Sequence, residues 1–298
     1  MTKDLSLPMT TIKMVQMIDY LLLPFSYQYM FNAISISVLV GAICAFLSAF
    51  LILKGWSLIG DALSHSIVPG VAGAYILGIP FSLGAFAAGG LAAGSIILLQ
   101  KYSGLKEDTI IGLTFTSFFG LGLFMASLWP LSVNVKTITM GNVLAISHED
   151  IIQILIIGFV TLFTLIWKWK DIMVAFFDEN HARSIGLNPH FLKGIFFVLL
   201  SATCVAALQT VGAFLVIAMI ITPGATAYLL TDRFSRVVIL SIIIGVISSF
   251  VGSYLSFFLD GATGALIVLT QTLIFILTFI FAPKYGYLEI LKSRNSLK

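Results

Sequence analysis

One apolar stretch of the chain carries two ionisable side chains that lie one helical turn apart. Asp61 and His65 stand within GDALSHSIVPG, residues 60–70 of a chain of 298 residues. A spacing of four residues places both side chains on the same face of a helix. A carboxylate oxygen and an imidazole nitrogen on adjacent turns can bind one divalent cation, and this pair of donors suits manganese, iron(II) or zinc. The sequence therefore predicts a metal site at Asp61 and His65.

The alternative for these two residues is an ion pair that only holds helices together. A charged side chain at the centre of a membrane helix costs at least about 2.5–3.5 kcal/mol, so a purely structural pair is a costly way to pack helices. Two ligands do not close a metal shell. Either a second copy of the chain contributes its own pair, or waters and backbone carbonyls complete the shell. Pro69 and Gly70 can loosen the helix and free such carbonyls.

The composition is that of a polytopic all-α membrane protein. Hydrophobic residues make up 59% of the chain and charged residues only 10%, against about 25% charged in soluble domains. Runs of about 20 apolar residues are long enough to cross a membrane. The sequence places nine of them, at residues 30–53, 57–78, 82–100, 109–129, 150–168, 191–208, 211–230, 237–259 and 263–283. Gln209 and Thr210 form only a thin break between two runs, so eight or nine transmembrane helices are expected.

Basic residues predict how the chain is oriented in the membrane. In the nine-span placement, thirteen of the sixteen Lys and Arg residues fall on one side, which is expected to be cytoplasmic. Residues 1–29, with Tyr20, Tyr27 and Tyr29, then form an outer interfacial segment. Residues 30–285 form the transmembrane domain, and residues 286–298 form a cytoplasmic tail.

Several function classes conflict with the sequence. No Gly-Lys dipeptide occurs, so the chain has no P-loop for ATP. A net charge of +3 gives no indication of nucleic-acid binding. An ion-coupled secondary transporter usually carries several intramembrane carboxylates, and a membrane-embedded zinc enzyme generally uses three protein ligands. These two classes remain as alternatives. The cysteines, Cys44 and Cys204, are expected to be buried thiols.

The metal pair belongs to the first of five stretches that carry a specific family resemblance. The stretches are LKGWSLIGDALSHSIVPGVAGAYILGIP (residues 53–80), KEDTIIGLTFTSFFGLG (106–122), MGNVLAISHEDI (140–151), FFDENHARSIGLN (176–188) and VGAFLVIAMIITPGATAYLLTDRF (211–234). In this order they closely resemble the permease subunit of bacterial ABC importers for manganese, zinc and iron(II), the ABC-3 metal permease family. The sequence Gly-Trp-Ser at residues 55–57, before the metal pair, is most similar to that of the manganese and iron branch.

The resemblance implies a multi-pass permease of the bacterial cell membrane that is not an enzyme and has no cofactor of its own. It implies a homodimer in contact with membrane lipids, two cytoplasmic ATP-binding subunits that hydrolyse ATP, and an extracytoplasmic metal-binding protein. The cargo is a divalent ion, with manganese favoured over zinc or iron(II). The family's metal site maps onto Asp61 and His65.

Coupling to the ATPase requires a cytoplasmic segment that fits that subunit. The best candidate in the sequence is TPGATAYLLTDRFSR, residues 222–236, which resembles the coupling loop of related importers. We expect Thr222 to cap a short helix with Pro223 at its first position. The residues expected to couple are Thr222, Pro223, Gly224, Ala225, Thr226, Asp232 and Arg233. Residues 167–193 form the other long cytoplasmic segment, where supporting contacts are expected. An ordinary solvated loop is the alternative for both.

Overall fold

The computed structural model describes residues 9–56, 58–128, 148–282 and 286–287, and every regular element in these ranges is a helix. The predicted all-α class is therefore confirmed. Seven described helices are long and apolar enough to cross a membrane. They are α2 (Gln28–Lys54), α5 (Phe81–Tyr102), α6 (Glu107–Leu128), α8 (His148–Phe177), α10 (Pro189–Val211), α12 (Phe234–Leu259) and α13 (Thr263–Phe281).

Shorter helices supply the two remaining apolar segments. The second predicted span is divided into α3 (Ile59–Ser66) and α4 (Val68–Leu77), and the seventh is α11 (Ala213–Leu230). Only Gly212 separates α10 from α11, with a φ of 84°, so the thin break expected near residue 209 is real. Together with the seven long helices, these segments agree with the nine-span placement.

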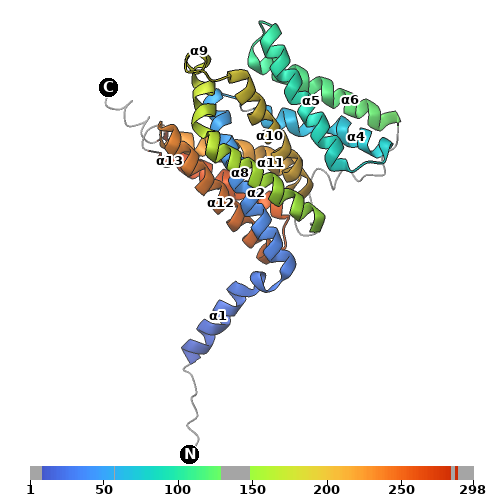
Figure 1. Cartoon of the computed structure of the whole chain (residues 1–298). Coiled ribbons are helices and arrows are strands. Elements are labelled where there is room, and N and C mark those ends of the chain that lie inside the picture. The colour runs from blue at the N-terminus through green and yellow to red at the C-terminus, as the bar shows by residue number, and fades with distance from the viewer. Residues whose placement is uncertain (1–8, 57, 129–147, 283–285, 288–298) are drawn as a thin grey trace, which may run out of the picture.

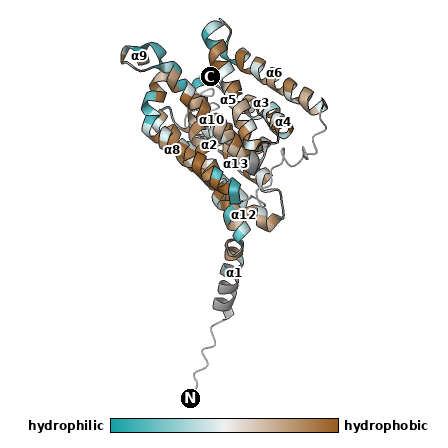
Figure 2. Ribbon diagram, turned by 45° about the vertical axis from the view of Figure 1, so that its right-hand side comes forward, coloured by the Kyte–Doolittle hydropathy of each residue, from teal (hydrophilic) through white to brown (hydrophobic). Residues whose placement is uncertain are grey.

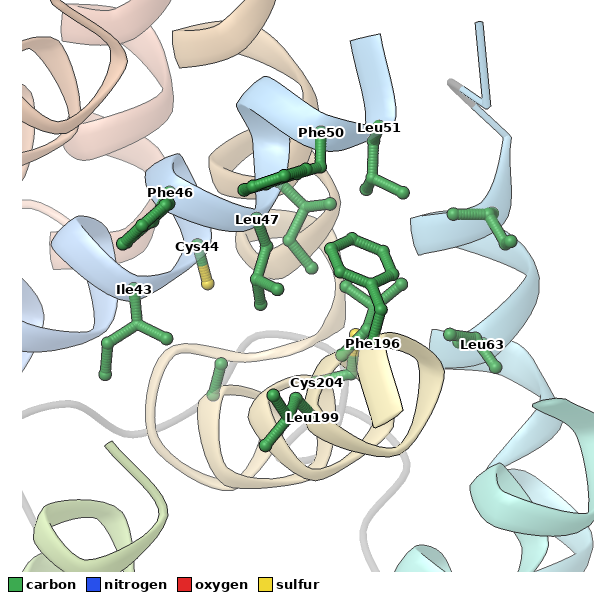
Figure 3. Packing of buried hydrophobic residues seen from close by; sticks show 14 of the residues in the cluster. Ile43, Cys44, Phe46, Leu47, Phe50, Leu51, Leu63, Phe196, Leu199 and Cys204 are labelled. Atoms are coloured by element: carbon green, nitrogen blue, oxygen red, sulfur yellow. The ribbon is translucent and has the colours of Figure 1, made fainter. Parts of the chain in front are cut away.

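Helix α2 is the centre of the bundle. It packs against α8, α10, α11 and α12, and Figure 1 shows it enclosed by these helices while α4, α5 and α6 form a neighbouring group. Its buried side chains include Leu47 and Phe50, which meet Phe196 of α10 in the core (Figure 3). Cys44 and Cys204 lie in the same core and are free thiols, as the sequence predicts.

Small residues let several helices approach until their backbones nearly touch. A Cβ atom placed on Gly245 of α12 would lie 2.6 Å from both the Ala45 Cβ and the Gly41 carbonyl oxygen of α2. The Ser241 hydroxyl also donates to the Ala45 carbonyl oxygen at 2.5 Å. Apolar side chains gain no free energy by leaving lipid, so helices in a membrane associate through close contacts of this kind. Gly41 and Ala45 of α2 therefore pack tightly on α12.

The glycine-rich run of α5 has two different faces. Gly84 packs on Gly70 and Ala74 of α4, and a Cβ on Gly84 would lie 2.6 Å from the Ala74 Cβ. By contrast, a Cβ added to Gly90 or Gly94 would meet no atom within 4 Å. Both residues line a hollow of about 630 Å³ beside α10. Gly84 therefore packs tightly on α4 and Gly89 on Ser201 of α10, whereas Gly90 and Gly94 face open space.

Helix α1 (Met9–Ser26) projects from the end of the bundle opposite α9 (Glu179–Ser184), as Figure 1 shows. Its C-terminal part packs on α12, where the rings of Tyr20 and Phe258 are 5.2 Å apart. The Tyr254 hydroxyl of α12 donates to the Leu21 carbonyl oxygen at 2.9 Å. The interfacial role of residues 1–29 and the division at residue 285 stay predictions.

Two alanine substitutions on α5 test the importance of this close approach. The variant Gly84→Ala forces α4 and α5 apart, and we expect a loss of about 1–3 kcal/mol in unfolding free energy. Gly90→Ala is the matched control, and its gain in helix propensity of about 0.5–1 kcal/mol should leave stability unchanged or slightly raised. Thermal unfolding in detergent measures both variants, and equal melting temperatures would contradict the packing described here.

Candidate metal site and cytoplasmic end

The helix that carries the candidate metal pair begins after a sharp turn. The last turn of α2 is closed by Gly55, with a φ of 73°, whose N–H donates to the Ile52 carbonyl oxygen. The Trp56 N–H donates to the Leu51 carbonyl oxygen at 2.9 Å, which completes this left-handed helix end. Helix α3 then starts at Ile59. Because α2 ends here, depth in the next span has to be counted from Ile59.

Asp61 and His65 both belong to α3. At a rise of 1.5 Å per residue, His65 lies about 9 Å along the span from Ile59, whereas counting on a straight helix from Lys54 gives about 16 Å and a position near the midplane. The described part of the chain includes the backbone of Asp61 and not its side chain, so the predicted pairing of the two side chains stays a prediction.

The structure places His65 beside an aromatic wall on α6. The His65 ring is half-buried, and its centroid lies 5.4 Å from that of Phe115 and 5.3 Å from that of Phe119, with both rings edge-on. Phe115 and Phe119 stack on each other with centroids 5.8 Å apart. Two phenylalanines four residues apart were the only sequence signal for this wall, and we did not predict it. The wall restricts the orientations open to the imidazole.

The break between α3 and α4 agrees with the predicted loosening of the helix. Proline has no N–H, so Pro69 cannot donate to the His65 carbonyl as a helix interior would require. Gly122 of α6 allows the close approach at this point, because a Cβ there would lie 2.9 Å from the Pro69 nitrogen. The Ser64 hydroxyl donates to the Gly60 carbonyl oxygen at 2.8 Å, which gives this serine a partner within its own helix.

No cluster of three or more His, Cys, Asp or Glu side chains occurs in the described part of the chain. A metal shell built on α3 therefore needs donors beyond those that the described side chains of one copy bring together. Of the predicted outer loop, residues 130–149, only His148 and Glu149 at the start of α8 are described. Glu149 and Asp150 stand in the first turn of α8, where acidic side chains favour a helix start.

The loops predicted to be cytoplasmic meet at one end of the bundle. The Trp56 indole Nε1 donates to Glu107 Oε2 at 2.5 Å, and Lys193 Nζ donates to Glu179 Oε1 at 2.5 Å. Phe234, at the start of α12, packs on Phe177 with ring centroids 6.4 Å apart. These contacts join the predicted loops near residues 54, 106, 180 and 233, and Figure 2 shows hydrophilic colouring at α9 in this region. The sequence prediction that these loops share one side is thus supported.

The expected helix start at Thr222 and Pro223 is wrong. Helix α11 runs through both residues to Leu230, with Pro223 inside it. A single hydroxyl on α2 accommodates the proline: Ser48 Oγ accepts from the Gly224 N–H at 2.9 Å and donates to the Ile221 carbonyl oxygen at 3.1 Å. The helix can therefore contain a proline, because Ser48 forms hydrogen bonds with the backbone groups on either side of it.

Burial divides the residues predicted to couple into two groups. Pro223, Gly224 and Thr226 are buried, and Gly224 lies against Ser48 of α2. Thr222 and Ala225 are partly buried in the same helix. Asp232 and Arg233, in the turn before α12, are exposed at the end predicted to be cytoplasmic. Of the seven residues predicted to couple, only Asp232 and Arg233 are exposed.

Helix α9 is the exposed element of the other segment predicted to be cytoplasmic. Asp178 caps it, and its Oδ1 accepts from the N–H groups of Asn180 and His181 at 2.9 and 3.0 Å. These hydrogen bonds, led by that from His181, lower the pKa of Asp178 from its usual value. The side chains of His181 and His190 are exposed, as expected of solvated loop histidines.

A family model supplies the decisive comparison. The model described as "ABC 3 transport family" matches residues 26–282. The chain belongs to this family. The chelated iron transport system membrane protein YfeC of Yersinia pestis is 60% identical over 282 residues, which cover 95% of this chain and 96% of YfeC. The manganese transport system membrane protein MntB of Synechocystis is 46% identical over 269 residues, which cover 90% of this chain and 88% of MntB.

Two solved structures share the fold of this chain. PsaBC from Streptococcus pneumoniae, solved in complex with Fab, has a TM-score of 0.79 and 35% identity, over 93% of this chain and 99% of that chain. An inward-facing conformation of a putative metal-chelate type ABC transporter has a TM-score of 0.66 at 15% identity, over 83% of this chain and 84% of its own. The second likeness concerns the fold alone. The chain is thus a multi-pass membrane transport protein of the ABC 3 family.

The cap of α9 gives a prediction that depends on pH. Since the folded pKa of Asp178 is lowered, its contribution to α9 is fully present above the unfolded value of about 3.9 and is lost as the pH falls through the lower folded value. At neutral pH, Asp178→Ala should therefore speed amide exchange in α9 several-fold. Hydrogen-exchange mass spectrometry measures this change.

Asp171→Ala is the control for the cap. Asp171 pairs with Lys168 on the surface of α8 at 2.9 Å, and such exposed pairs contribute little. Exchange in α9 should stay at the wild-type rate in this variant. Unchanged exchange in Asp178→Ala would show that the cap does not hold α9.

Proposed function

We propose that this chain is the permease subunit of an ATP-driven importer of Mn²⁺ or Fe²⁺, with Asp61 and His65 in the translocation pathway. Membership of the ABC 3 transport family carries this proposal, together with near-full-length relatives that are named manganese or chelated iron transport proteins. Zinc is the less favoured cargo. A helix that is broken one turn after His65 supports the site, since such breaks expose carbonyl oxygens near an ion pathway.

The half-buried position of His65 also fits a transfer site. A neutral imidazole is a good ligand for divalent transition metals, and a carboxylate on the preceding turn adds negative charge. An open shell of few protein ligands is suited to an ion that has to leave again. In the proposed importer, a second copy of the chain would place another pair across the pathway.

Two cytoplasmic ATP-binding subunits would drive the cycle, because the chain has no P-loop of its own. We assign their contact to the surface that Asp232 and Arg233 form together with α9. The ring contact between Phe177 and Phe234 joins these two parts into one surface. The buried residues Pro223, Gly224 and Thr226 would act behind that surface, by fixing α11 against α2. An extracytoplasmic metal-binding protein would deliver the ion.

The metal site is tested by uptake in cells. Asp61→Asn keeps the size of the side chain and removes its charge, so uptake of radioactive Mn²⁺ should fall at least about tenfold, as expected for the loss of a charged ligand. The chain would be expressed with its ATPase partners in a strain that lacks manganese and iron importers. Immunoblots of the membrane fraction verify that the variant is present.

Asp260→Asn is the matched control for the site. Asp260 is exposed in the turn before α13 with a φ of 48°, a conformation that asparagine tolerates. Its uptake should equal that of the wild type. Uptake by Asp61→Asn at the wild-type rate would show that Asp61 is not part of the pathway. Uptake by the permease alone in vesicles without ATP would instead establish an ion-coupled transporter.

The docking surface is tested by adding bulk to it. Ser184 is exposed on α9, and Ser184→Trp should reduce co-purification of the ATPase subunits severalfold, because shape complementarity is lost at the contact. Leu259→Trp adds a large ring at the opposite end of α12, where Leu259 is also exposed, and should leave co-purification intact. Full recovery of the ATPase with Ser184→Trp would exclude α9 as the contact.

A further inference from the structure

A set of buried contacts connects α9 to the residues that precede the candidate metal site. Lys193 of α10 is only 5% exposed, and its ammonium group donates to Glu179 of α9 at 2.5 Å. The hydrogen bond and the positive charge of Lys193 lower the pKa of Glu179, although burial alone would raise it. Arg183 is a weaker second partner of Glu179 at 3.7 Å. Lys193 therefore fixes α9 to the N-terminal end of α10.

The same ammonium group faces the indole of Trp56. Lys193 Nζ lies 5.9 Å from the ring centroid, within the range of a cation–π contact. Trp56 is 1% exposed and stacks on Phe197 of α10, with centroids 5.3 Å apart and planes inclined by 19°. The ring of Phe176, at the end of α8, also packs on Trp56, with ring centroids 5.3 Å apart. The ring of Trp56 thus has a single well-packed position.

The polar edge of Trp56 is used as well. Its Nε1 donates to Glu107, the first residue of α6, at 2.5 Å. A hydrogen bond to a carboxylate is about twice as strong as a bond between neutral groups. About two and three turns further along α6, Phe115 and Phe119 form the wall against which His65 packs. Glu107 therefore ties Trp56 to the helix that orients His65.

Trp56 consequently reaches the metal-binding turn by two routes. Along the chain, α3 begins three residues after it, at Ile59. Across space, Glu107 and α6 lead to the ring of His65. A shift of α9 that breaks or moves the Lys193 contact would change the position of Trp56. Because tightly packed interiors transmit displacement, that change would reach α3 by both routes.

We propose that Trp56 is a positioning residue that couples the docking of the ATPase on α9 to the orientation of His65. Glu179, Lys193 and Glu107 complete this connection. Trp56 itself touches no ion and takes no part in metal binding. The inference rests on the proposed function, since it requires an ATPase at α9 and an ion at His65.

The test compares metal transport with ATP hydrolysis in the complete importer in proteoliposomes, with ATPase subunits and binding protein. Trp56→Phe keeps an aromatic ring and removes the indole N–H that Glu107 accepts. We expect the number of Mn²⁺ ions moved per ATP to fall about tenfold. The affinity of the detergent-solubilised permease for Mn²⁺ should stay within about twofold of wild type, because Asp61 and His65 are intact.

The control is Trp167→Phe. Trp167 is 71% exposed on α8 and also lies under a cation, with Lys168 Nζ at 5.4 Å from its ring. The chemical change is identical, and transport per ATP should equal that of the wild type. Glu107→Gln is the second variant: it keeps the shape of the acceptor, weakens the same hydrogen bond, and carries the test if Trp56→Phe does not fold.

Three results would overturn the inference. One is a wild-type ratio of ions to ATP in Trp56→Phe or in a folded Glu107→Gln. Another is an equal loss of Mn²⁺ affinity and transport, which would mean that Trp56 only supports the fold. The third is additive effects in the double variant, since two changes to one hydrogen bond should not add. A wild-type importer that moves neither Mn²⁺ nor Fe²⁺ would instead refute the proposed function, which separates the two failures.

Discussion

Close backbone contact between helices is the constraint on which the candidate metal site depends. Within lipid, apolar side chains gain nothing by leaving the membrane, so helices associate where small residues allow their backbones to meet. The divided span of α3 and α4 is held in this way on three sides. Gly60 faces Ile220 of α11, Gly70 faces Gly84 of α5, and Gly122 of α6 faces Pro69. A span that is broken in the middle needs this support, because it cannot rely on an uninterrupted helix for its shape.

The polar groups freed by such breaks find partners in other helices. At Pro223, one serine hydroxyl from α2 serves an N–H and a carbonyl of α11 at once. This answers the requirement that backbone groups within a membrane be satisfied inside the protein. It also explains why α2 is so deeply buried: it supplies close contacts to α12 and hydrogen bonds to α11 along the same length. The central helix α2 and the proline-containing helix α11 therefore depend on each other.

Much of this architecture could be predicted from the sequence, since local composition determines it. Apolar length located all nine segments, and Pro69 marked the break after His65. The error at Pro223 has a physical cause, because the residue that keeps α11 continuous, Ser48, lies 173 positions before the carbonyl that it binds. The wall of Phe115 and Phe119 was missed for a similar reason. Phenylalanines four residues apart are common in membrane helices, and only the packing of α6 on α3 gives this pair its role.

The two native thiols have a practical consequence for studying the transport cycle. Cys44 and Cys204 are enclosed in the core, away from water and from lipid. A cysteine introduced in place of Tyr102, which is 75% exposed at the end of α5, would instead be accessible to water and to a thiol reagent. A maleimide-linked spin label or fluorophore should then react at one chosen point without removal of the native cysteines. The motion of α5 relative to α8 and α10 could thereby be followed in an otherwise unaltered chain.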